Sequence, residues 1–103
     1  MQFDVYKNRS AAKERFPYLL DVQVGLLDAL ETRVVIPLAL KESFEGKILS
    51  VLSPVLEVKG KEYVALTSQL AGVAKRDLGS YVVSAAQKRQ EIIAAIDFLF
   101  TGV

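Results

Sequence analysis

Residues 33–38 read RVVIPL, and the apolar run that follows Arg33 is the strongest indication of the fold class. Val34, Val35 and Ile36 are β-branched and favour an extended strand. A run without polar alternation is typical of a strand that is buried on both faces or lies at a seam of a sheet. Pro37 cannot donate a backbone hydrogen bond to a ladder, so it predicts a sheet edge or a bulge at this point.

Shorter strand patterns precede this run. Residues 2–6 alternate between apolar and polar side chains, and residues 18–24 alternate again. In the second segment one side of the strand carries Leu20, Val22 and Val24, and the other carries Leu19, Asp21 and Gln23. Both segments therefore predict strands of a sheet that has one solvated face.

A hairpin is predicted further along the chain. Residues 54–58 and 63–66 are strand-like and flank the sequence KGKE, in which Gly60 is available for a left-handed backbone position. A weaker strand is expected at residues 70–74, and an irregular or briefly helical connector at 41–51. Strands in the front of the chain and one helix at its end give an α+β protein or a small barrel with a C-terminal helix.

The sequence closes on residues 96–103, IDFLFTGV, which are mostly apolar. Upstream, Ser84 and Gln87 have the spacing of a capping box and predict a helix from about residue 85 to 100. Its apolar stripe consists of Ile92, Ile93, Ile96, Leu99, Phe100 and Val103. Two interpretations stay open: a C-terminal helix docked on the core, or a final turn that contacts a partner.

The composition indicates one domain, residues 1–103, that associates with a second copy of itself. Apolar residues make up 51% of the chain and the mean hydropathy is +0.28, more than one small core can cover. Thirteen basic and twelve acidic side chains leave a net charge of +1, which argues against direct nucleic-acid binding. No stretch has the length of a membrane span and no signal-peptide pattern is present, so we expect a cytoplasmic protein with no membrane partner.

The absence of cysteine and histidine excludes several kinds of chemistry. Disulfides, thiol nucleophiles, zinc sites and imidazole acid–base catalysis all need one of these residues. Gly46 and Lys47 do not complete a phosphate-binding loop, because Lys41 stands where its first glycine belongs. Carboxylates such as Glu42 and Glu45 have no activated partner near them in sequence and are best explained as solvated surface charge. We therefore expect no cofactor, no metal and no catalytic residue.

One polar segment, residues 7–15 with the sequence KNRSAAKER, carries four basic side chains and one acidic one. A charge run of this kind is usually a solvated loop. If the loop has a function, an acidic peptide is its natural partner.

Several segments spread over the chain together resemble the CcdB family of bacterial toxins. They are Met1-Gln2-Phe3-x-Val5-Tyr6, Leu20-Asp21-Val22-Gln23, Ser53-Pro54-Val55, Val35-Ile36-Pro37-Leu38 and the terminal Phe100-x-Gly102-Val103. The resemblance implies a mainly β protein, a small SH3-like barrel of antiparallel strands with a C-terminal α-helix, that forms a two-fold homodimer.

The resemblance also implies a function, that of the toxin in a type II toxin–antitoxin pair of the kind that serves plasmid maintenance. Such a toxin poisons DNA gyrase by binding its A subunit and trapping the enzyme with its DNA cleaved, which needs no catalytic residue. Its antitoxin, of the CcdA type, wraps the dimer with a disordered C-terminal tail.

Carried over by position, the resemblance implies two sets of contact residues. The gyrase-binding set is Leu26, Leu27, Lys88, Gln90, Glu91, Asp97, Phe100, Thr101, Gly102 and Val103. The antitoxin-binding set is Asn8, Arg9, Ser10, Lys13 and Arg15. Two positions depart from the family pattern: Thr101 stands where the pattern has a tryptophan that stacks on a gyrase arginine, and Asp97 stands where it has a neutral amide.

Two alternatives stay open. An endoribonuclease toxin shares the same barrel, although the lack of histidine and the near-neutral charge argue against RNA cleavage. A non-toxic dimeric CcdB-like binding module is the other, because Thr101 removes the large stacking platform.

Overall fold

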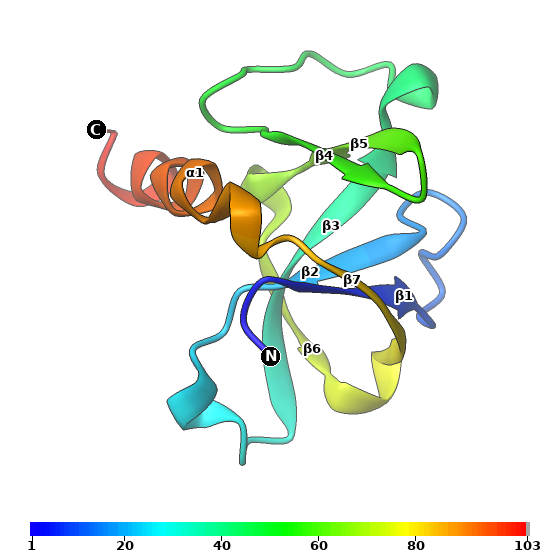
Figure 1. Cartoon of the computed structure of the whole chain (residues 1–103), viewed down its shortest axis with the longest axis vertical. Coiled ribbons are helices and arrows are strands. Elements are labelled where there is room, and N and C mark those ends of the chain that lie inside the picture. The colour runs from blue at the N-terminus through cyan, green and yellow to red at the C-terminus, as the bar shows by residue number, and fades with distance from the viewer. Residues whose placement is uncertain (103) are drawn as a thin grey trace.

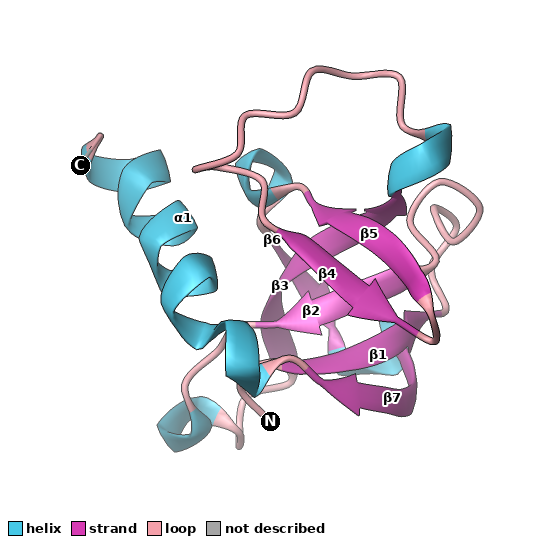
Figure 2. Ribbon diagram, turned by 45° about the horizontal axis from the view of Figure 1, so that its top comes forward, coloured by secondary structure: helices cyan, strands magenta, loops and turns pink. Residues whose placement is uncertain are grey.

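The computed structural model describes residues 1–102 as a curled antiparallel sheet with a helix packed along one side (Figures 1 and 2). The strands are β1 (Asp4–Asn8), β2 (Tyr18–Asp21), β3 (Thr32–Leu40), β4 (Val55–Val58), β5 (Lys61–Ala65), β6 (Ala71–Ala74) and β7 (Leu78–Ser84), and the helix is α1 (Arg89–Thr101). Short 3₁₀ turns are η1 (Gly25–Leu27), η2 (Lys41–Ser43), η3 (Thr67–Gln69), η4 (Lys75–Asp77) and η5 (Ala86–Lys88). The strand order is β4-β5-β3-β2-β1-β7, with β6 also paired to β3. The predicted mainly β fold, a small SH3-like barrel of antiparallel strands with a C-terminal helix, is confirmed, and the curled sheet forms a half-barrel.

Strand β3 lies at the centre of this sheet, and its apolar residues are buried as the sequence predicts. Val35, Ile36 and Leu38 are at most 1% exposed. On one side β3 pairs with β2, at residues 35–38. On its other side it pairs first with β6, at residues 32–35, and then with β5, at residues 38–40.

Pro37 lies where β3 changes partner strand. Its carbonyl accepts the N–H of Leu66 at 3.0 Å. In an extended strand the N–H and C=O of one residue point to the same side, so the N–H that proline lacks would face the gap between β5 and β6. The irregularity predicted at Pro37 is therefore a change of partner and not a sheet edge.

Helix α1 closes the main core. Ile92 and Ala95 are fully buried, and Ile92 packs in one cluster with Val5, Leu20 and Ile36 from the sheet. Burying side chains of this size contributes about 1.5–3 kcal/mol each. A second, smaller cluster contains Phe16, Ala39, Val64 and Leu66, with Phe44 packed against it.

The predicted hairpin is confirmed. Val58 pairs with Lys61, which leaves Lys59 and Gly60 as a two-residue turn. Both have positive φ, 52° and 80°, the backbone of a type I′ turn. Strand β6 and the irregular connector after η2 also lie where the sequence predicts them.

The predicted solvated face of residues 18–24 is wrong. Asp21 is 1% exposed and Gln23 is 5% exposed, although both are polar. They are buried because Arg33 and neighbouring backbone groups satisfy their polar atoms. The first strand also begins later than predicted, since Phe3 has a φ of 70° and only Asp4 starts the extended chain.

The predicted helix start is wrong as well. Helix α1 begins at Arg89 after the η5 turn, and its N-cap, Lys88, makes no side-chain capping bond. The Ser84 hydroxyl accepts the N–H of Ala86 at 3.1 Å instead of capping the helix. The reason is that residues 78–84, for which no strand was predicted, form β7 and pair with β1.

The apolar stripe is only partly as predicted. Ile92 is buried and Ile93, Ile96 and Leu99 are partly buried, but Phe100 is 70% exposed and therefore does not contribute to the core face. Val103 lies outside the described residues.

Candidate functional site

An exposed apolar turn follows β2. Leu26, in η1, is 92% exposed, and Val24, Leu27 and Leu30 around it are between 45% and 48% exposed. Neighbouring apolar side chains left open on one short segment are typical of a contact surface for another protein. Two of the predicted gyrase-binding residues, Leu26 and Leu27, lie in this turn.

Beneath the turn lies a buried ion pair. The Arg33 guanidinium donates from Nε and Nη2 to Oδ2 of Asp21, at 3.2 and 2.7 Å. Its Nη1 donates to Oδ1 of Asp28, which follows η1 directly. Lys75 adds a bond from Nζ to the Asp28 carbonyl at 2.6 Å. The end of the turn is thus fixed to β3 and to η4.

Gln23 fixes the start of the same turn. Its backbone N–H donates to Oδ1 of Asp21 at 3.0 Å, and its side-chain amide donates to the Leu27 carbonyl and accepts the N–H of Val34, both at 3.0 Å. With both ends bonded to buried groups, the turn is held in a defined shape, which lowers the entropy lost when a partner binds.

Arg33 and Asp28 each favour the charged form of the other. Burial disfavours the charged form of Arg33, but hydrogen bonds to Asp28 and Asp21 outweigh it and raise the pKa of Arg33 above its usual value. The hydrogen bond from Arg33 in turn lowers the pKa of the Asp28 carboxyl. Because Arg33 is engaged by two carboxylates, it is not available as a catalytic acid or as an anion site.

The C-terminal turn of α1 offers a second exposed apolar side chain, Phe100. Close to it, the Thr101 hydroxyl donates to the carbonyl of Asp97 at 2.7 Å, so these two residues lie together as the sequence spacing predicts. Gly102 adopts a left-handed φ of 77° and its N–H donates to the Phe98 carbonyl at 3.0 Å, which ends the helix. This closure presents Phe100 on an ordered helix end.

The remaining predicted gyrase contacts lie at the other end of the helix. Lys88 and Glu91 form an exposed ion pair at 3.6 Å, and Gln90 lies beside them. At 1.5 Å per residue, Gln90 and Phe100 are about 15 Å apart along the axis. The η1 turn and the C-terminal end of α1 also lie apart in both overall views (Figures 1 and 2). One chain therefore does not bring all of these residues together.

The basic loop between β1 and β2 has its own internal support. Asn8 is buried, donates to the Phe16 carbonyl at 2.8 Å and accepts the N–H of Ser10 at 2.9 Å. Ser10 in turn accepts the N–H of Ala12 at 3.3 Å. These two predicted antitoxin contacts hold the shape of the loop, whereas Arg9, Lys13 and Arg15 are exposed.

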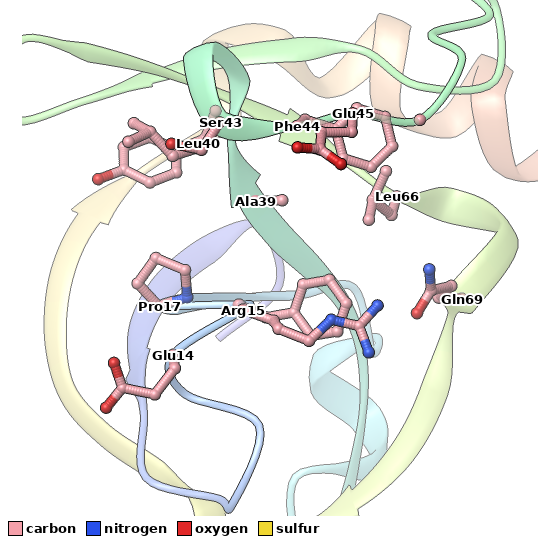
Figure 3. A pocket seen from close by; sticks show the side chains of 13 residues that line it. Glu14, Arg15, Pro17, Ala39, Leu40, Ser43, Phe44, Glu45, Leu66 and Gln69 are labelled. Atoms are coloured by element: carbon pink, nitrogen blue, oxygen red, sulfur yellow. The ribbon is translucent and has the colours of Figure 1, made fainter.

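A cleft of about 660 Å³ opens beside this loop (Figure 3). In the close view Glu14 and Arg15 lie on one side of it and Phe44 and Glu45 on the other. Its lining is largely apolar and includes Phe16, Pro17, Ala39, Leu40, Phe44, Tyr63 and Leu66. No sequence pattern pointed to this cleft, because its walls come from three separate segments of the chain.

The sequence of the chain matches the model of a known protein family. The sequence model of the family described as "CcdB protein" matches residues 2–102. The chain belongs to the CcdB family of toxins. The exposed η1 turn, the exposed helix end and the basic loop all lie within the matched residues.

Solved structures show the same fold at low sequence identity. This CcdB-family chain superposes on Mycobacterium tuberculosis toxin MazF-mt6 with a TM-score of 0.74 and 13% identity, over 94% of this chain and 95% of the other. An endoribonuclease in complex with its cognate antitoxin, from Mycobacterial species, gives 0.72 and 15%, over 96% and 92%. A structure described as an Mtb toxin gives 0.72 and 14%, over 93% and 99%. At these identities the likeness concerns the fold alone.

Two further observations bear on the chemistry of the CcdB-family chain. Among residues 1–102, no group of three or more carboxylate, histidine or cysteine side chains is arranged to hold a metal ion. Within the same residues, no helix combines the length and apolar character needed to cross a membrane.

Proposed function

We propose that this CcdB-family chain is the toxin of a type II toxin–antitoxin pair, and that it acts in the cytoplasm by binding the DNA gyrase A subunit and trapping the cleaved gyrase–DNA complex. The observation that carries the proposal is the exposure of two ordered apolar tips, Leu26 at 92% and Phe100 at 70%. A protein that acts by wedging into a partner needs such tips and needs no catalytic group.

Five of the ten predicted gyrase-binding residues have a distinct role in this proposal. Leu26 and Phe100 supply apolar contact area, and Thr101 and Gly102 shape the helix end. Asp97 adds a charge that the target has to match. Because the η1 turn and the helix end lie apart in one chain, we propose that a two-fold dimer presents both to a two-fold target, so that each contact is made twice.

The proposal is tested with purified protein and bacterial DNA gyrase. We expect inhibition of supercoiling together with linear DNA released from trapped cleavage complexes. An inhibitor that only competes for DNA would block supercoiling without trapping, and that result would contradict the mechanism.

An endoribonuclease is the second candidate, favoured by one observation: the fold matches that of a chain described as an endoribonuclease. Against it, the chain has no histidine and its buried arginine, Arg33, is fully paired. Incubating the same sample with single-stranded RNA separates the two, because cleavage of RNA without any effect on gyrase would favour the nuclease. No effect in either assay would favour the non-toxic binding module.

Assembly is the first prediction. We expect a homodimer, because large apolar side chains other than the two proposed gyrase contacts are exposed, among them Ile48, Leu49 and Val51. Sedimentation equilibrium at micromolar concentration measures it directly. A mass of 11.3 kDa, that of one chain, would contradict the prediction.

Antitoxin binding is the second prediction. We propose that the loop bearing Asn8, Arg9, Ser10, Lys13 and Arg15 binds an acidic disordered tail of the CcdA type, and that apolar side chains of that tail reach the adjoining cleft. Replacing Arg9, Lys13 and Arg15 by glutamine should weaken binding of a fluorescein-labelled peptide of alternating glutamate and leucine, and should flatten its salt dependence. Fluorescence anisotropy at two ionic strengths measures both. Unchanged binding would mean that the loop is only solvated surface.

A further inference from the structure

We infer that the surface for the acidic antitoxin tail continues from the loop at residues 9–15 onto η4, with Arg76 as a direct contact. Gly79 is the residue that makes room for Arg9 on this surface. This inference rests on the proposed antitoxin function of the loop. It adds a segment that lies more than sixty residues away in sequence and that no sequence pattern singled out.

The first observation is a set of bonds between the loop and η4. The Arg9 guanidinium donates from Nε and Nη2 to the carbonyl of Arg76, at 3.1 and 2.7 Å. The backbone N–H of Arg9 donates to the carbonyl of Asp77 at 2.8 Å. Arg9 binds the backbone of residue 76 and not its side chain, and Arg76 is an exposed residue.

The second observation is the glycine on the neighbouring strand. A Cβ atom at Gly79, in β7, would lie 3.1 Å from Cγ of Arg9 and 3.1 Å from Cβ of Lys7. It would also lie 3.1 Å from the Lys7 carbonyl oxygen. Contacts this short require the neighbours to move. The missing side chain at Gly79 thus lets Lys7 and Arg9 lie side by side over β7.

The third observation is the local charge. Lys7, Arg9 and Arg76 are all exposed, as are Lys13 and Arg15 of the loop. The acidic residues of these two segments are Glu14, which is exposed, and Asp77, which is partly buried. Since the whole chain carries only +1, positive charge is concentrated here and balanced elsewhere. A concentrated positive surface on a nearly neutral protein suits a short acidic segment.

An apolar element lies next to these charges. Tyr81, two residues beyond Gly79, is 56% exposed, and its ring packs edge-on against Tyr6 with centroids 6.2 Å apart. A peptide that alternates acidic and apolar residues could place its charges on the arginines and an apolar side chain on this ring. For this reason we assign the surface to a peptide.

Single charge reversals test the inference with the labelled glutamate–leucine peptide. Arg76→Glu keeps the backbone carbonyl that binds Arg9, and it should weaken binding about three- to tenfold, as Lys13→Glu should in the loop. Arg89→Glu is the matched control, because it makes the same change of charge at an exposed arginine at the start of α1, outside both predicted contact sets. It should change the affinity less than twofold.

A second variant tests the geometry without altering any charge. Gly79→Ala should displace Lys7 and Arg9 and weaken peptide binding, while the melting temperature, measured on the same sample, reports any loss of fold. Binding of this variant at wild-type strength would overturn the role of Gly79.

The outcomes separate this inference from the function on which it rests. If Lys13→Glu weakens binding and Arg76→Glu does not, the inference is overturned while the loop remains the proposed site. If neither variant weakens binding, both proposals fail. If Arg89→Glu weakens binding as much as Arg76→Glu, the effect is one of net charge and the inference is overturned. Single-stranded RNA displacing the peptide at lower concentration than unlabelled peptide would also overturn it.

Discussion

Deleting Thr101, Gly102 and Val103 should abolish gyrase inhibition while the protein stays folded. The deletion removes the bond from the Thr101 hydroxyl to Asp97 and the left-handed cap at Gly102, each worth on the order of 1 kcal/mol. It leaves the buried anchors Ile92 and Ala95 in place. Stability should therefore fall modestly, and the loss of activity should be much larger than the loss of fold. The melting temperature and the supercoiling assay on one sample measure both.

Two substitutions sharpen this experiment. Phe100→Ala keeps the terminal residues and removes only the exposed ring, so it should weaken inhibition with little effect on the melting temperature. Thr101→Trp adds a ring of the kind that stacks on arginine, a contact worth about 0.5–2 kcal/mol, and should strengthen poisoning. Full inhibition by the truncated protein, or no gain from tryptophan in a normally folded variant, would mean that the helix end is not the gyrase contact.

Removing one partner of the buried ion pair should cause the largest loss of stability. Arg33→Met leaves Asp21 at 1% exposure without its guanidinium partner, and breaking a buried pair in this way costs about 3–5 kcal/mol. The N-terminal ammonium, 3.1 Å from the same carboxylate oxygen, compensates only in part because it is itself exposed. Urea denaturation gives the free energy of unfolding. We expect a protein that is folded in buffer but unfolds at much lower denaturant.

Asp28→Asn is the matched control for that variant. It removes the other carboxylate partner of Arg33, but Asp28 is 56% exposed, so the loss of stability should be much smaller than that of Arg33→Met. Equal losses for the two variants would contradict the view that burial decides the cost. Because Asp28 closes the η1 turn, its replacement should also loosen Leu26 and reduce gyrase binding.

The parts of the fold that the sequence predicts are those decided by neighbouring residues. The β-branched run of β3 and the Lys59-Gly60 turn each carry their own signal. Strand β7 does not, because its pairing with β1 is interrupted by two register shifts, between Val5 and Tyr6 and between Tyr6 and Asn8. Such shifts break the strict alternation by which a strand is recognised in a sequence.

The candidate site also has a part that could be predicted from the sequence and a part that could not. Leu26, Leu27 and Phe100 were predicted through the family resemblance, and the structure shows all three exposed, although their role stays a prediction. The burial of Asp21 and Gln23 could not be predicted, because their alternation gives no sign that Arg33 will bind beneath the turn. The Arg9–Arg76 contact and the cleft depend on segments that meet only in the folded chain.

The pairing of β1 with β7 has a consequence for how the protein is made. Val5 pairs with Val83, so the first strand cannot complete its ladder until nearly the whole chain has been synthesised. At about 5–20 residues per second, the ribosome takes on the order of ten seconds to bridge that distance. During that time one edge of β1 lacks its partner strand and is open to pairing with other chains. The nascent chain thus passes through a stage in which aggregation competes with closure of its sheet.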